Sequence, residues 1–381
     1  MKQNKIAIIT SGHSPFDERI YWKFGNSLAK NNFFVNIISS TSEIKQNDRS
    51  IIVTGFSDKN LNKWNKITKF LEILKSFSPE IIICCEPLTI LPSFIFKIFH
   101  KRHCKIISDI TEWYPENVAF KFSGLKKIIS FIILYFLNII LTNLTNALIL
   151  GEETKKKRYD VITPSKGKII ISYYPVLEFF DTSPPNFNGK YLTLCYAGLV
   201  NFDRGIFQLL DIAKIISEKH NKINVKVKIL GDFSSKKEEK IFDELLPKYS
   251  NIIIEKIART DYRNISNIIS DADICFDLRV RNFIYNNSLP IKIFEYMASG
   301  KPFIFSDIKP IRKELGEINC GFLVNPNDQQ EIITKIELYI SNSNLLYQHG
   351  LNGRNIIESS KNWEKESEKL ISFLYSLLNS K

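Results

Sequence analysis

The stretch NNSLPIKIFEYMASGKPFIFSD, residues 286–307, decides the fold of this chain. Its polar turn ends at Pro290, whose fixed φ suits the entry to a helix. Apolar residues then recur at three- and four-residue spacing over 291–299, which predicts a helix with one apolar face. Gly300 suits the residue just past a helix end, and the apolar run at 303–305 predicts a buried strand. This order of turn, helix and strand is typical of an α/β domain.

The same turn and helix offer chemistry that suits a nucleotide. The first turn of a helix has free backbone N–H groups and the positive end of the helix dipole, which together attract a phosphate. Glu295 lies one turn into the helix, where a carboxylate can accept both hydroxyls of a ribose. Such a loop, helix and strand are more often plain scaffold, so the residues by themselves leave both interpretations open.

The motif SLPIKIFEYMASGKPFI resembles the nucleotide-sugar motif of family 4 glycosyltransferases, which are retaining enzymes with the GT-B fold. The resemblance implies that Glu295 binds the donor ribose. It also implies a donor-binding segment made of Asn287, Ser288, Leu289, Pro290, Ile291 and Lys292. The family usually has another glutamate eight positions before Glu295. This chain has Asn287 there, so the carboxylate expected to face the donor sugar is an amide.

A second turn, GLVNFDRG at residues 198–205, resembles a family turn that ends in a basic residue and a glycine. The resemblance implies that Gly198 and Arg204 belong to the donor site. Arg204 would reach the diphosphate, where a fixed cation stabilises the departing charge. The alternative is that Arg204 is an ordinary surface arginine.

The N-terminal turn, which lies between a predicted strand at 5–10 and a predicted helix at 20–30, resembles the family opening in its sequence HSPFDERI. This resemblance implies that His13, Asp17 and Arg19 line a cleft on the acceptor side. Alternatively, Asp17 caps the helix and Arg19 pairs with it.

Gly12 is the only glycine in this turn. The glycine-rich fingerprint of dinucleotide enzymes is therefore missing, and we expect no nicotinamide cofactor.

The segment DITEWYPENV, residues 109–118, follows a predicted strand and resembles a D-x-H-E turn of the family. The position of the family histidine is Thr111, which would still lie at the acceptor side. Asp109 and Glu112 remain as candidate catalytic carboxylates at a strand end. They could orient an acceptor hydroxyl or hydrogen-bond to the backbone.

Composition and charge narrow the possible partners. The chain has 381 residues, 44% of them hydrophobic, and a net charge of +12, which favours anionic partners such as nucleotide diphosphates, nucleic acid or a membrane surface. The basic residues lack interleaved aromatics, so nucleic acid is not expected. Six cysteines form no C-x-x-C pair and no apolar run opens the chain, which predicts a reduced, cytoplasmic protein.

The predicted architecture is two Rossmann-like, doubly wound α/β domains that face a cleft, with a C-terminal helix that crosses back to the first. The predicted domains are residues 1–177 on the acceptor side and residues 189–355 for the nucleotide sugar. A linker rich in proline and asparagine joins them at 178–188, and residues 356–381 form the crossover. An Asp271-Ala-Asp273 sequence is discounted as a metal motif because it precedes a predicted buried strand, and no metal is expected.

Residues 128–150 contain no charged residue, and Lys126 and Lys127 come directly before them. We predict a helix at 125–141. Polar residues interrupt the apolar run, so a span across a membrane is disfavoured. Contact with an anionic bilayer surface and packing inside the first domain both stay open.

Taken with the resemblance, these features predict a metal-independent hexosyltransferase. It would move a sugar from a nucleotide diphosphate sugar to a hydroxyl of a saccharide, which a polyprenyl diphosphate could carry, in surface polysaccharide biosynthesis. It would be cytoplasmic, and peripheral on the inner face of the plasma membrane if it binds one. It would need no cofactor. The alternatives are an inactive nucleotide-sugar-binding partner and a sugar-nucleotide epimerase on the same fold.

Overall fold

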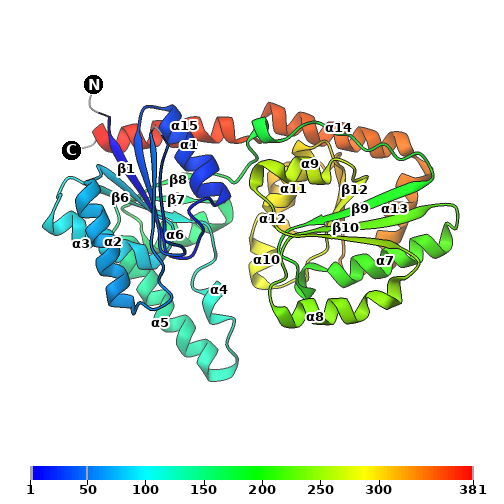
Figure 1. Cartoon of the computed structure of the whole chain (residues 1–381), viewed down its shortest axis with the longest axis horizontal. Helices are drawn as coiled ribbons and strands as arrows, with labels where there is room; N and C mark the ends of the chain where they lie inside the picture. The colour runs from blue at the N-terminus through cyan, green and yellow to red at the C-terminus, as the bar shows by residue number, and fades with distance from the viewer. Residues whose placement is uncertain (1–2, 49, 380–381) are drawn as a thin grey trace. The chain divides into compact units, whose positions relative to one another are not determined.

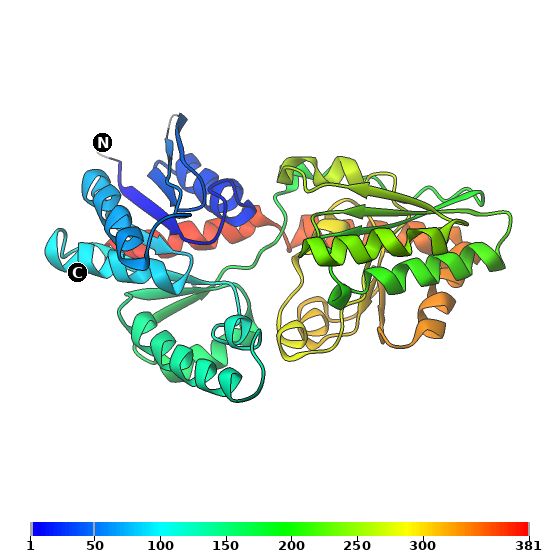
Figure 2. The same cartoon turned by 60° about the horizontal axis from the view of Figure 1, so that its bottom comes forward.

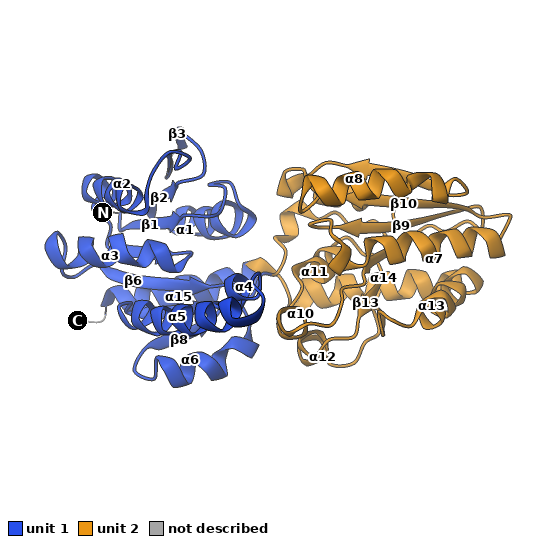
Figure 3. Ribbon diagram, turned by 90° about the horizontal axis from the view of Figure 1, so that it is seen from below, with its two compact units in different colours: residues 1–173, 364–381 blue, residues 174–363 orange. Residues whose placement is uncertain are grey.

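A computed structural model describes residues 3–48 and 50–379, and it divides the chain into two compact units (Figure 3). Unit 1 holds the residues up to Tyr173 and those from Glu364 onward, and unit 2 holds Tyr174–Trp363. The segment predicted as a linker, residues 178–188, lies within unit 2. There Asp181 N donates to Ser266 Oγ at 3.1 Å.

Unit 1 is built on one sheet, whose described strands lie in the order β3-β4-β2-β1-β5-β6-β7-β8. The strands are β1 (Lys5–Thr10), β2 (Phe34–Ser39), β3 (Ile44–Asp48), β4 (Ile51–Gly55), β5 (Ile81–Cys84), β6 (Lys105–Ile110), β7 (Ala147–Leu150) and β8 (Gly167–Ile170). All pairings are parallel except the edge pair β3–β4. The central strands are near-continuous apolar runs because helices cover both faces of the sheet.

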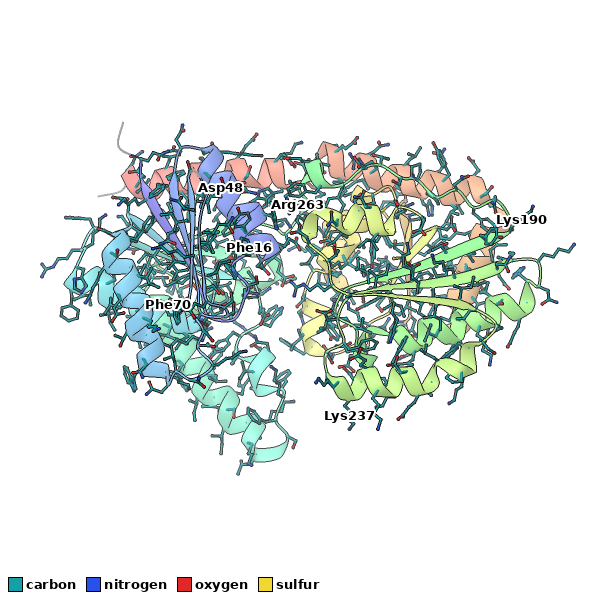
Figure 4. The ribbon with its side chains drawn as sticks, in the orientation of Figure 1. Phe16, Asp48, Phe70, Lys190, Lys237 and Arg263 are labelled. Carbon is teal, nitrogen blue, oxygen red and sulfur yellow. The ribbon has the colours of Figure 1, made fainter. Side chains whose placement is uncertain are left out.

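Helices follow most of these strands, as Figure 1 shows. They are η1 (Glu18–Gly25), α1 (Asn26–Lys30), α2 (Lys63–Phe77), α3 (Pro87–Phe99), α4 (Glu116–Ala119), α5 (Gly124–Asn143), η2 (Glu153–Lys155) and α6 (Lys156–Ile162). The predicted helix at 20–30 is thus two pieces, of which the first, η1, is π-helical. Phe70 of α2 points into the core (Figure 4), where its ring centroid lies 5.0 Å from that of Phe56.

The last helix, α15 (Trp363–Asn379), packs on unit 1. Glu366 accepts a hydrogen bond from Ser172 N at 2.8 Å, and Tyr375 donates to Asn31 O at 3.2 Å. The ring of Tyr375 also lies 5.0 Å from that of Phe33. The predicted return of a C-terminal helix to the first domain is confirmed.

Unit 2 has a parallel sheet with the described strands in the order β11-β10-β9-β12-β13-β14. They are β9 (Tyr191–Ala197), β10 (Asn224–Leu230), β11 (Ile253–Ile257), β12 (Ile274–Asp277), β13 (Phe303–Ser306) and β14 (Gly321–Val324). Counted along unit 2, the order is 3-2-1-4-5-6, the order of a dinucleotide-binding fold. The direction of winding therefore reverses between β9 and β12, where such sheets bind ligands.

The helices of unit 2 lie on both faces of its sheet (Figure 2). They are η3 (Leu177–Phe179), η4 (Phe202–Arg204), α7 (Ile206–Lys219), α8 (Lys236–Leu245), η5 (Leu246–Tyr249), η6 (Tyr262–Asn264), α9 (Ile265–Ile269), α10 (Phe283–Asn287), α11 (Ile291–Ala298), α12 (Lys309–Leu315), α13 (Gln329–Ser341) and α14 (Ser343–Ser359). The predicted helix at 291–299 and strand at 303–305 are confirmed as α11 and β13. The predicted fold class, two doubly wound α/β domains, is confirmed.

Helix α5 differs from the other helices in what it leaves exposed. Among the described residues it is the one helix long and apolar enough to cross a membrane, and only 6% of its most apolar window is buried. We name its exposed apolar residues the outer stripe: Leu125, Ile128, Ile129, Ile132, Ile133, Phe136, Leu137 and Ile140. The interpretation that this segment packs inside the first domain is therefore wrong for these residues.

Candidate functional site

Two glycines shape the point in unit 2 where the winding of the sheet reverses. Gly198 follows β9 and Gly231 follows β10, with φ of 154° and 141°. A Cβ added to Gly231 would lie 1.9 Å from the carbonyl oxygen of Gly198, so only glycine fits this crossing of two loops. This close approach fixes the path of the turn from Gly198 to the start of α7.

Arg204 lies in that turn and is held on both sides. Its backbone N–H donates to the Asn201 side chain at 3.0 Å. The next residue, Gly205, has φ of 72°, and an added Cβ there would lie 2.3 Å from the Leu278 carbonyl oxygen. The backbone around Arg204 is therefore fixed before any ligand binds, which is the condition for a preorganised cation.

The side chain of Arg204 is half-buried in a polar setting. Burial opposes its charge, but Tyr196, Asp277 and Tyr285 outweigh this effect and raise the pKa of Arg204. Its carbon Cζ lies 5.9 Å from the centroid of the Tyr285 ring. Its Nε is buried and has no hydrogen-bond acceptor among the described residues. A buried N–H group without an acceptor costs free energy. An anionic oxygen that accepted a hydrogen bond from Nε would remove this cost.

A second arginine lies on the same tyrosine. Arg279 follows β12, and its Nε donates to Asp277 Oδ1 at 2.9 Å in a pair that is almost wholly buried. Its carbon Cζ lies 5.2 Å from the ring centroid of Tyr285. Tyr285 belongs to α10, which leads directly into the predicted donor turn. Arg204, Tyr285 and the turn before α11 thus form one continuous group.

Helix α11 is fixed against the end of β9. The hydroxyl of Tyr296 accepts a hydrogen bond from Ala197 N at 2.7 Å. Pro290 is the N-cap residue of α11, and Asn287 Nδ2 donates to the Phe283 carbonyl oxygen at 2.7 Å. The predicted donor residues are therefore continuous: Asn287 ends α10, Ser288, Leu289 and Pro290 form the turn, and Ile291 and Lys292 begin α11.

Glu295 is completely buried in α11, and its Oε2 lies 2.6 Å from Lys292 Nζ. The side chain of Lys292 is itself 20% exposed, so it lies between the carboxylate and solvent. A ribose would reach Glu295 by displacing this ammonium group.

In unit 1, a pocket of about 260 Å³ lies at the corresponding reversal, between β1 and β5. Glu86, which follows β5, ties the two strand ends together. Its carboxylate accepts hydrogen bonds from Thr10 Oγ1 at 2.6 Å, Ser11 N at 2.7 Å and Gly12 N at 3.2 Å. The pocket is therefore bounded by a carboxylate already occupied with backbone and hydroxyl donors.

Four of the residues predicted for the acceptor side line this pocket: His13, Asp109, Thr111 and Glu112. The ring nitrogens of His13 lie 3.7 Å from Asp17 and 3.7 Å from Glu86. The four predicted residues come from two separate segments of the sequence, and the fold places both segments at one pocket.

Asp17 and Arg19 do not line the pocket. Asp17 caps η1 by accepting from Arg19 N at 2.9 Å. The guanidinium of Arg19 does not pair with Asp17. It is 2% exposed and binds Asp109 through two hydrogen bonds of 2.7 Å, and it donates to Ile171 O at 3.1 Å. The alternative in which Arg19 pairs with Asp17 is wrong, because the fold buries Arg19 against a carboxylate on another strand.

Comparison with known proteins bears on these sites. Residues 179–356 match the family described as glycosyl transferases group 1. The fold is similar to that of sucrose-phosphate synthase from Thermosynechococcus elongatus, with a TM-score of 0.79, 14% identity and 100% of each chain covered. It is also similar to Anabaena HepE in complex with UDP-glucose (TM-score 0.72, 11% identity, 98% of this chain and 99% of that one). A glycosyltransferase from Rickettsia africae gives a TM-score of 0.72 at 13% identity, with 100% of both chains covered. No curated protein matches the chain in sequence.

The family match spans nearly all of unit 2, including Arg204 and α11. Unit 2 therefore matches the group 1 glycosyltransferases over nearly all of its length. The solved structures show that the fold of each is similar to that of the whole chain. Their sequence identities are too low to show activity or substrate. The prediction of a GT-B glycosyltransferase is confirmed at this level, while membership of family 4 and retention of configuration stay predictions.

Sequence reasoning missed several residues that lie at the reversal in unit 2 and at the pocket of unit 1. Arg279 and Tyr285 were not singled out, and neither was Glu86. Both Glu86 and Arg279 come within two residues of the end of a buried strand. That position was the available signal, since ligands bind at the carboxyl ends of parallel strands.

Cys85 also lines the pocket in unit 1. Burial raises the pKa of its thiol well above the usual value, so the group stays protonated at neutral pH. It is therefore no candidate for a nucleophile.

The Asp271-Ala-Asp273 sequence of unit 2 is accounted for by structural contacts. Asp271 pairs with Lys228, and Asp273 accepts from Thr193 N at 2.8 Å. Over residues 3–48 and 50–379, no cluster of three or more His, Cys, Asp or Glu side chains could hold a metal ion.

Asp273→Asn should change how stability depends on pH. Burial raises the pKa of Asp273 from 3.8 to about 6, so the charged form costs the folded state stability above that pH. The contribution of Asp273 to the stability of the wild type should be fullest below about pH 4 and be lost as pH rises through 6, by roughly 2–3 kcal/mol relative to the variant. The asparagine variant should lack this fall. Urea unfolding at several pH values measures it.

Asp271→Asn is the matched control, since the two carboxylates differ in the direction of their pKa shifts. Burial opposes the charge of Asp271, but the ion pair with Lys228 outweighs it and lowers the pKa. The stability that Asp271 contributes is therefore present above the pKa of this carboxyl in the unfolded chain and is lost as pH falls. This is the reverse of the pH dependence expected for Asp273. Equal pH profiles for both variants would contradict the assignment.

Proposed function

We propose that the chain transfers a sugar from a nucleotide diphosphate sugar to a hydroxyl of a saccharide acceptor, with retention of the anomeric configuration and without metal. The observation that carries this is Arg204. It is a half-buried cation whose buried Nε has no acceptor among the described residues, held on a fixed turn beside Tyr285, in a domain that matches the group 1 glycosyltransferases.

The donor would bind unit 2 through three contacts. The diphosphate would accept hydrogen bonds from Arg204 and from backbone N–H groups of the turn from Ser288 to Ile291. The ribose hydroxyls would bind Glu295 after Lys292 turns away, and the released ammonium could then pair with a phosphate oxygen. The amide of Asn287 would face the donor sugar. That HepE was solved with UDP-glucose on the same fold supports a uridine or similar nucleotide sugar as donor.

The chemistry would need little from side-chain bases. In a front-face mechanism the departing phosphate takes the proton of the acceptor hydroxyl, so the protein mainly positions both substrates and stabilises the leaving charge. The threonine at position 111 and the amide at 287 are therefore compatible with activity. Glu112 and His13 of the unit 1 pocket would orient the acceptor.

The acceptor would be a saccharide, carried by a polyprenyl diphosphate, in the assembly of a surface polysaccharide. A similar fold in the lipopolysaccharide outer core galactosyltransferase WaaB supports a saccharide acceptor (TM-score 0.63, 17% identity). The protein would act in the cytoplasm, peripheral on the inner face of the plasma membrane.

The test is incubation of the purified chain with a panel of labelled sugar nucleotides in the presence of EDTA. We expect slow hydrolysis of one donor, with retained configuration in the released sugar, because water can replace a missing acceptor. Arg204→Ala should lower this rate at least about 100-fold, the usual effect of losing one stabilising group at a developing charge. A donor whose sugar is changed would establish the epimerase instead, and binding without turnover would establish an inactive partner.

A further inference from the structure

The strongest unexplained feature of unit 1 is the outer stripe of α5. A helix on a soluble domain usually turns its apolar stripe toward the core and its polar residues toward solvent. In α5 the order is reversed: Leu125 is 70% exposed, Phe136 61% and Ile140 57%. The stripe continues without a break from residue 125 to 140, about 22 Å along the helix axis.

The opposite face of the same helix is polar and faces the pocket of unit 1. Asn138 and Thr142, one turn apart, are each 2% exposed and line the pocket that also holds Asp109 and Glu112. Asn138 Nδ2 donates to the Tyr159 hydroxyl at 3.2 Å. One helix therefore has a polar side that bounds the candidate acceptor pocket and an apolar side without cover in unit 1.

The charges around the stripe are of one sign. From residue 117 to 151 the sequence has no Asp or Glu, and its charged residues are Lys121, Lys126 and Lys127. Lys121 and Lys126 are exposed, and Lys127 Nζ lies 4.1 Å from the centroid of the Phe120 ring. In Figures 1 and 2, this N-terminal end of α5, with α4, projects beyond the sheet of unit 1. An apolar stripe flanked by lysines complements an anionic lipid surface.

We propose that α5 lies in the plane of an anionic bilayer, with its outer stripe among the acyl chains and the three lysines at the headgroups. The pocket on its other side is then held at the membrane surface, within reach of a sugar attached to a lipid. The membrane contact stands without the proposed function, and the role of the pocket as acceptor site rests on it.

An in-plane position follows from the way the inner face of α5 is tied to the domain. Asn143 Nδ2 donates to the Ile162 carbonyl oxygen at 2.9 Å, and Leu141 packs against the core under α2 and α3. Tyr135 and Ile139 pack against the core beside β7. A helix that crosses the bilayer would have to break these contacts along its whole C-terminal half.

Vesicle flotation tests the surface with matched variants. The wild type should float with vesicles of phosphatidylcholine and phosphatidylglycerol. It should bind them less at about 1 M salt, where the Debye length is about 3 Å and the lysines are screened from the headgroups. Changing Ile128, Ile132 and Phe136 together to serine should lower vesicle binding at least about tenfold, since these side chains supply the buried apolar area. The melting temperature should not fall, because all three are exposed.

The control triple variant changes similarly exposed large side chains of unit 2 to serine: Tyr191, Ile253 and Tyr347, which are 59%, 55% and 40% exposed. It should float like the wild type. Equal flotation of the two triple variants, or none by the wild type, overturns the proposal. A concentration-dependent dimer that the stripe variant abolishes, with no flotation, would assign the stripe to a second copy of the chain.

Depth measurements separate an in-plane helix from a span. Environment-sensitive labels on cysteines introduced at Leu125, Ile132 and Ile140 should be quenched from the same shallow depth. A label at Ile132 far deeper than the other two would overturn the in-plane position. Nucleotide binding, measured by calorimetry on the stripe variant, should equal that of the wild type. If neither chain binds nucleotide but the wild type floats, the proposed function fails and the membrane contact stands.

Discussion

Glu295→Ala should weaken nucleotide binding at least about 100-fold, as measured by calorimetry with the donor that the panel identifies. In our proposal the carboxylate accepts both ribose hydroxyls. Hydrogen bonds to a charged group contribute about 1.5–3 kcal/mol each, so losing two costs roughly 3–6 kcal/mol. The melting temperature should change little, because Lys292, the ion-pair partner, is 20% exposed and can turn to solvent.

The chain offers a close control for this variant. Glu366 of α15 is likewise almost wholly buried and paired with a lysine three residues away, Lys369. Glu366→Ala should lower stability, because it also removes the acceptor of Ser172 N, yet leave nucleotide affinity unchanged. Similar losses of affinity in both variants would indicate general damage to the fold. Affinity retained within about threefold in Glu295→Ala would remove Glu295 from the donor site.

The sequence predicted those parts of the structure that depend on neighbouring residues. Pro290 and Gly300 mark the ends of α11 to within about one residue, because helix entry and exit are set by local backbone preferences. The buried strands were found from their continuous apolar runs. Local pattern was therefore enough to predict the turn before α11, while its role as donor site stays a proposal.

Contacts between distant residues could not be predicted in this way. The partner of Arg19 is 90 positions away at Asp109, and the tyrosine shared by Arg204 and Arg279 lies on a third segment. Such pairs depend on strand order, which propensity does not specify. Each long-range pair therefore follows from the sheet topology and not from local pattern.

The composition of helix α5 did not indicate which of its sides faces the domain. Apolar residues occur on every side of this helix, so their periodicity predicted a helix but did not predict which side faces the domain. The signal that was available is the pair Asn138 and Thr142, spaced one turn apart on one face. Two polar residues at that spacing in an apolar helix indicate a buried polar surface, here the pocket, and thereby place the apolar side outward.

Asp109→Asn should lower the free energy of unfolding by about 3–5 kcal/mol, because it leaves the buried Arg19 without its countercharge. Burial opposes the charge of Arg19, while Asp109 favours it strongly enough to raise the pKa of the arginine. An arginine side chain does not lose its proton in proteins even without a countercharge, so the guanidinium stays charged in the variant and carries the full penalty. Urea unfolding at neutral pH measures the loss.

A double variant distinguishes a structural pair from a catalytic carboxylate. Arg19 lies 4.5 Å from the ring centroid of Phe24 and 4.1 Å from that of Tyr173, an apolar setting that a methionine would fill. Asp109→Asn combined with Arg19→Met should thus be more stable than Asp109→Asn alone, since no unpaired charge remains. If Asp109→Asn is as stable as the wild type but transfers sugar more slowly at saturating donor, Asp109 acts on the acceptor and is not merely a structural partner of Arg19. Recovery of stability in the double variant would instead assign Asp109 to holding β6 against η1, and leave Glu112 as the carboxylate that orients the acceptor.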